Sequence, residues 1–101
     1  MRIWAKTIEQ QKIKSDVVRE FSLARPSVLE EWIPILHALC QDLDLSRPVL
    51  LNKHVNELAR FNRTVFRASD FMEPVPFDRF EIEILIEKRS MNPSFKRILT
   101  P

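Results

Sequence analysis

The chain has 101 residues, with no glycine, no tyrosine and a single cysteine. Phosphate-binding loops and the strained turn of an α/β-hydrolase nucleophile need glycine, so both kinds of site are excluded. One cysteine excludes an internal disulfide and a zinc site made of cysteines alone. The rest of the composition, 45% apolar and 30% charged, is typical of a globular domain.

The basic residues are concentrated at the end of the chain. The formal net charge is +2, and no acid follows Glu87. Four bases do follow it: Lys88, Arg89, Lys96 and Arg97. We therefore expect a single domain over residues 1–87 and a basic, flexible tail over residues 88–101.

No apolar stretch reaches the length of about 18 residues that a membrane-spanning helix needs. The first residues alternate with charges and lack the apolar core of a signal peptide. Together with the single cysteine, this pattern predicts a cytoplasmic protein without a membrane partner.

Alternating apolar and polar residues predict a strand over residues 2–9 and a second strand over residues 13–21. The alternation breaks at Val17 and Val18, where we expect a bulge. Tight two-residue hairpin turns favour glycine. The glycine-free connection over residues 9–12 is therefore expected to be a longer loop or a type I turn with a bulge.

Apolar residues recur at helical period over residues 28–43 and predict a long helix. Ser27 and Glu30 have the spacing of a capping box at its start. Pro34 lies within this helix and is expected to kink it, because proline cannot donate the hydrogen bond of the preceding turn.

A short second helix is predicted over residues 53–62, with Asn52 as its N-cap. Residues 64–66 and 79–87 then predict two further strands, the latter with apolar residues alternating with glutamate apart from Leu85. The expected fold is α+β: an antiparallel sheet of three to four strands, covered on one face by the two helices.

The aromatic residues show characteristic spacings: Trp4, Phe61-x-x-Thr64-x-Phe66, Phe71-x-Glu73, Phe77-Asp78 and Glu81-Ile82. Over residues 1–87 this pattern resembles a family of small uncharacterised bacterial proteins. The resemblance implies no activity and assigns no catalytic residue. It favours a widespread cytoplasmic role.

The best candidate for a binding site is the basic segment 45–67, which holds five bases against the single acid Glu57. An acidic segment with six carboxylates follows over residues 70–87. The favoured interpretation is internal pairing of the two segments. The alternative is binding of nucleic-acid phosphates by bases of this segment and of the tail. The residues concerned are Lys53, Arg60, Arg63, Arg67, Lys88, Arg89, Lys96 and Arg97.

Two other sets of residues are candidates for chemistry. His37 and Cys40 are three residues apart on the long helix and are weak candidates for metal ligands, so no metal site is predicted. His37 and His54 have the residue type for acid–base catalysis of RNA cleavage. Cys40 lies in mid-helix, where the neighbouring amides are already bonded, so it is not expected to act as a nucleophile.

These features predict a small, non-enzymatic protein-interaction module without a cofactor. The expected partner is a second copy, through an exposed strand edge or the outer sheet face, or an unidentified protein. A nucleic-acid-binding protein is the alternative, and a small ribonuclease that uses His37 and His54 is the second alternative.

Overall fold

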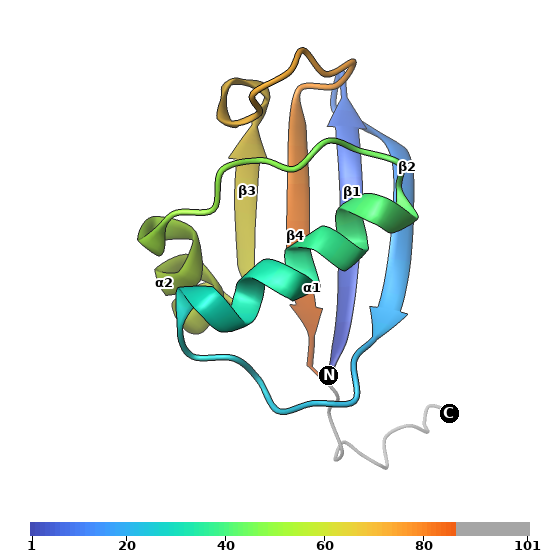
Figure 1. Ribbon diagram of the computed structural model, residues 1–101. Helices are drawn as coiled ribbons and strands as arrows, with labels where there is room; N and C mark the ends of the chain where they lie inside the picture. Colours follow the sequence, from blue (N-terminus) through green and yellow to red (C-terminus); the bar gives the residue numbers. More distant parts are fainter. Residues whose placement is uncertain (87–101) are drawn as a thin grey trace, which may run out of the picture.

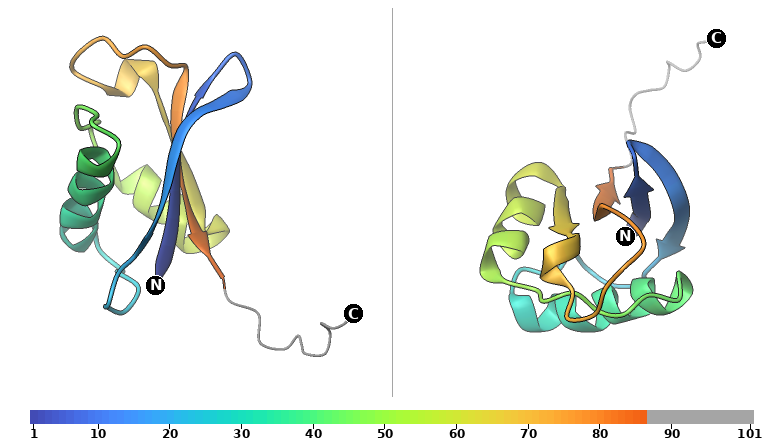
Figure 2. Two further views of the ribbon diagram at one scale, coloured as in Figure 1. Left: turned by 90° about the vertical axis from the view of Figure 1, so that its right-hand side faces the viewer. Right: turned by 90° about the horizontal axis from the view of Figure 1, so that it is seen from above.

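The computed structural model describes residues 1–86, and it has the predicted α+β fold. Four strands form one antiparallel sheet in the order β2-β1-β4-β3. The helix α1 lies across one face of this sheet, and α2 flanks β3 (Figures 1 and 2). The elements in chain order are β1 (Arg2–Glu9), β2 (Lys12–Glu20), α1 (Leu29–Asp42), α2 (Asn52–Phe61), β3 (Arg63–Arg67), the 3₁₀ turn η1 (Ala68–Asp70) and β4 (Arg79–Leu85).

The predicted tail over residues 88–101 lies outside the described residues. Within residues 1–86, neither helix has the length and apolar character needed to cross a bilayer.

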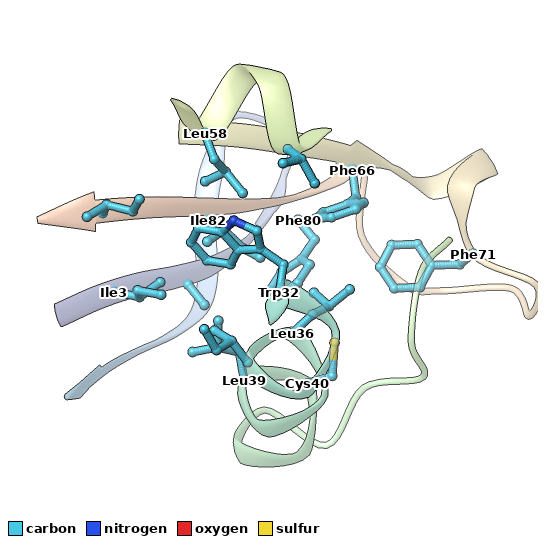
Figure 3. Close-up of a cluster of buried hydrophobic side chains, with 14 of the residues drawn as sticks. Ile3, Trp32, Leu36, Leu39, Cys40, Leu58, Phe66, Phe71, Phe80 and Ile82 are labelled. Carbon is cyan, nitrogen blue, oxygen red and sulfur yellow. The ribbon is translucent and has the colours of Figure 1, made fainter. Parts of the chain in front are cut away.

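The core lies between α1 and the face of the sheet that it covers (Figure 3). Strand positions two apart point to the same face, so β1 and β4 each place alternate apolar residues under the helix. The main contributors are buried: Ile3 and Ala5 from β1, Phe80, Ile82 and Ile84 from β4, and Trp32, Ile35, Leu36, Leu39 and Cys40 from α1.

The hairpin between β1 and β2 closes with a tight two-residue turn, so the prediction of a longer loop or a type I turn with a bulge was wrong. Glu9 pairs with Lys12, and the two residues between them, Gln10 and Gln11, have φ of 53° and 65°. Positive φ at both central residues is the signature of a type I′ turn. The Gln10 N–H donates a hydrogen bond of 2.8 Å to the Asp78 carboxylate, which helps to hold this conformation without glycine.

The bulge in the hairpin was also predicted at the wrong place. The register shifts between Thr7 and Ile8, opposite Lys14, whereas Val17 and Val18 continue the regular pairing. Val17 packs on the core and Val18 is exposed, so their neighbouring apolar side chains lie on opposite faces of β2. Two adjacent apolar residues on an edge strand therefore need no irregularity.

The start of α1 differs from the predicted capping box. The helix begins at Leu29 with Val28 as its N-cap, and no side chain caps it. The Ser27 N–H instead donates to a carboxylate oxygen of Glu31 at 3.1 Å. The helix runs without interruption through Pro34, which is exposed.

The limits of α2 are set by Leu51 and Asn62. Leu51, rather than the predicted Asn52, is the N-cap. Its N–H donates to Nδ1 of His54, and its carbonyl accepts from the His54 N–H, both at 3.0 Å. Asn62 has a left-handed conformation with φ of 60°, which ends the helix and turns the chain directly into β3.

Candidate functional site

A groove of about 540 Å³ lies between α2 and the edge strand β3. This volume is within the range of ligand sites in proteins. The groove is lined by Lys53, Glu57 and Phe61 from α2 and by Arg63, Thr64, Val65 and Arg67 from β3.

Two regular spacings bring these side chains together. On α2, residues four apart lie on the same side, so Lys53, Glu57 and Phe61 follow one another along the groove. On β3, Arg63 and Arg67 lie two positions on either side of Val65 and share its face of the strand. The left-handed turn between helix and strand folds these two rows side by side.

The groove gathers three of the four candidate bases of the segment. A single basic stripe would need the helix to run on to Arg67, but the helix ends at Phe61. Lys53, Arg63 and Arg67 meet across the groove instead. Arg60 lies beside it, with its guanidinium carbon 5.5 Å from the centre of the Phe61 ring.

The acids of the following segment do not neutralise these bases within residues 1–86, so the favoured prediction of internal pairing was wrong. Glu83 lies opposite Arg63 in the sheet, yet it contacts Lys6 of β1 at 3.4 Å. Glu81 contacts Lys6 at 3.8 Å and Arg79 at 2.8 Å. Lys53, Arg60, Arg63 and Arg67 form no ion pair with a described residue.

The single acid of the groove is held by a hydrogen bond. The Thr64 hydroxyl donates to a carboxylate oxygen of Glu57 at 2.5 Å. Thr64 is buried and Glu57 is half-buried, so this bond fixes the carboxylate against the wall of the groove. The lining has three positive charges against one, and Arg60 adds a fourth beside it.

Phe61 is the exposed aromatic residue of the groove. Phe66, Phe71, Phe77 and Phe80 are buried, but 65% of Phe61 is exposed. The buried side of α2 consists of His54, Val55 and Leu58. Phe61 is the last residue of the helix, and its side chain lines the groove.

The structure does not support a pair of catalytic histidines. His54 is fully buried, and its ring centre lies 4.3 Å from that of Phe66. Burial lowers the pKa of His54, partly offset by the carboxylate of Asp70. His37 lies on α1, where a ring nitrogen is 3.0 Å from the Arg47 guanidinium. A buried imidazole cannot exchange protons with a substrate, so the ribonuclease alternative lacks one of its two groups.

The weak metal candidates also fail to form a site. Cys40 is buried, and burial raises the pKa of its thiol to about 12, which disfavours the thiolate that metal binding requires. No cluster of three or more potential ligands occurs in the part of the chain that the structure describes.

The outer face of the sheet, opposite α1, is occupied by its own polar network. The Lys6 ammonium lies 3.5 Å from the centre of the Trp4 ring, and the Trp4 indole N–H donates to Asp16 at 2.9 Å. Lys6 and its partner Glu81 are buried by their neighbours on this open face. A partner at this face would have to compete with interactions that the chain already makes.

Comparisons with protein families, with curated proteins and with solved structures gave no match. The resemblance to small bacterial proteins therefore remains an expectation from the aromatic spacings.

Proposed function

We propose that the groove between α2 and β3 binds single-stranded nucleic acid. The observation that carries this proposal is the convergence of Lys53, Arg63 and Arg67, none of which pairs with a described acid, around the exposed ring of Phe61. Single-stranded nucleic-acid sites typically combine such positive charge with an aromatic surface on which a base stacks.

The unpaired state of the bases favours a polyanionic ligand. Binding a phosphate here breaks no salt bridge among residues 1–86, and it releases counterions from the nucleic acid. The one acid that lines the groove, Glu57, is itself bound, because its carboxylate accepts a hydrogen bond from the Thr64 hydroxyl. Phosphates therefore gain electrostatic energy in the groove without competition from an ion pair among residues 1–86.

The exposed aromatic residue favours a single strand over a duplex. Phe61 stands at the end of α2 with most of its ring accessible, and the Arg60 guanidinium lies beside it. A ring can stack only on a base that is not already stacked in a duplex. The preference for a single strand thus depends on Phe61, and the phosphate affinity depends on the bases.

The test is fluorescence anisotropy with labelled oligo(U) and with a duplex of the same length, over a series of salt concentrations. We expect tighter binding of the single strand and a steep loss of affinity with salt. Arg67→Ala should reduce the slope of log K against log salt by about 0.7, the value of one phosphate contact on a single strand.

Lys12→Ala is the matched control, because Lys12 is exposed in β2, at the opposite edge of the sheet from the groove. It removes the same charge but should leave the slope unchanged. Absence of binding at low salt would refute the proposal. Equal effects of Arg67→Ala and Lys12→Ala would show that the binding reflects overall charge and not this groove.

A further inference from the structure

The outer edge of β2 presents backbone groups that have no partner among residues 1–86. Met1 and Phe21 exchange both of their backbone hydrogen bonds, at 3.0 and 2.7 Å. In an antiparallel pair, hydrogen-bonded and non-bonded residue pairs alternate. Counting from Met1 and Phe21 along the regular register, Asp16, Val18 and Glu20 direct their N–H and C=O groups away from β1.

The two edges of the sheet differ in how they are covered. Beside β3 lies α2, whereas no element of residues 1–86 lies along the outer edge of β2 (Figures 1 and 2). The edge at β2 is also the longer one, with 9 residues against 5 in β3. Val18 is 51% exposed at its middle, next to its cross-strand partner Trp4. An uncovered edge of this length is a template for a further strand.

We propose that β2 pairs antiparallel with β2 of a second copy of this chain, which joins two sheets into one of eight strands. A two-fold axis makes such an interface use the same residues twice. Hydrogen bonds between the two copies form only where outward-facing residues lie opposite each other. The allowed registers therefore pair Asp16, Val18 and Glu20 with one another or with other residues of β2 at even positions.

The charges on this edge select one register. Placing Val18 opposite Val18 sets Asp16 against Glu20, and placing Asp16 opposite Asp16 also apposes like charges. Both arrangements are unfavourable for directly opposite residues. The intermediate register sets Val17 on the two-fold axis, pairs Asp16 with Val18, and brings Lys14, the residue at the bulge, to Glu20 at each end. Within the chain Lys14 lies 3.2 Å from Glu9, and Glu20 lies 3.3 Å from the N-terminal ammonium. Across the interface Lys14 and Glu20 would exchange these exposed contacts for each other, and this complementary charge at both ends identifies a second copy as the occupant.

The sharpest test is Val18→Pro, with mass measured by light scattering over a range of protein concentrations. The wild type should approach twice the monomer mass of 12.0 kDa. The Val18 N–H makes no bond to β1, so proline there spares the monomer and removes a bond of the interface. We expect a folded monomer, with folding checked by circular dichroism. A wild-type chain that stays monomeric at all concentrations, or a Val18→Pro chain that stays dimeric, would overturn the proposal.

A charge exchange tests the register and does not depend on proline. Glu20→Lys should weaken the dimer, because it sets two lysines opposite each other, and Lys14→Glu combined with Glu20→Lys should restore it. Failure of the double variant to restore the dimer would refute this register. Deletion of residues 88–101 should leave the dimer intact, and loss of the dimer on deletion would show that the tail makes the contact instead.

Discussion

The imidazole of His54 stacks on Phe66 in the core, with 4.3 Å between the ring centres. Its Nδ1 accepts the Leu51 N–H, and its Nε2 has no hydrogen-bond partner among the described residues. The neutral ring suits this place, because a second proton would charge a buried group and remove the acceptor at the start of α2. The charged groups that act on it are Asp70, Lys53 and Glu57.

The first prediction concerns the stability of the fold against pH. Burial lowers the pKa of His54 below its ordinary value of about 6.5, so the unfolded chain takes up this proton more readily than the folded chain. The contribution of His54 to stability is complete above that value and decreases as the pH falls through it. The melting temperature should therefore fall between pH 8 and 5, and His54→Gln should flatten this part of the profile. His37→Gln is the control and should keep the wild-type profile.

The second prediction concerns the exposed ring in the groove. Phe61→Ala should weaken binding of oligo(U) by about 1–3 kcal/mol, or about five- to 150-fold in Kd, because one stacking contact is lost. The salt slope should not change, since no charge is removed, and duplex binding should change little. Met72→Ala, which trims an apolar side chain that is 85% exposed elsewhere, should leave the affinity as it is. An equal loss for single strand and duplex would contradict a stacking role.

The third prediction concerns the hairpin turn. Gln11 has a positive φ, a conformation that costs a residue with a side chain about 1–2 kcal/mol and costs glycine little. Gln11→Gly should therefore stabilise the domain by about 1 kcal/mol and raise its melting temperature by about 4–8 °C. Lys12→Gly, one residue further and within β2, should lower it. A destabilising Gln11→Gly would show that the turn is not left-handed in solution.

The fourth prediction concerns the single thiol. Because Cys40 is buried and its pKa is raised to about 12, the folded protein should react with iodoacetamide at pH 8 much more slowly than the unfolded protein. Labelling should rise in parallel with unfolding in a denaturant series followed by circular dichroism. Rapid labelling of the folded chain would place Cys40 at the surface.

Local patterns were sufficient to predict the strands and the long helix. β1, β4 and α1 each bury one face. The apolar residues of that face recur every second residue in the strands and at helical period in α1, so the pattern is visible in a short stretch of sequence. The first and last strands and both helices were therefore predicted within a few residues of their observed limits. The Gln10–Gln11 turn was missed because its conformation is held partly by Asp78, which lies 68 residues away in the chain.

For the candidate site, the sequence predicted only which basic residues are present, and not how they are arranged. The bases were visible, but their meeting in one groove depends on the chain reversal at Asn62. Their lack of partners depends on strand order: β4 lies between β1 and β3, so Glu83 has cations on both sides and contacts Lys6 rather than Arg63. Such a choice between two neighbours cannot be read from the spacing of charges along the sequence.

The position of β4 also constrains how the chain reaches its fold. This last strand of the described chain lies inside the sheet, and it alone joins the β1–β2 hairpin to β3. During synthesis the hairpin, both helices and β3 emerge first, but the sheet cannot close until residues 79–85 have left the ribosome. The sheet therefore closes only after β4 has emerged, and a chain that stops before β4 loses the centre of its sheet rather than an edge.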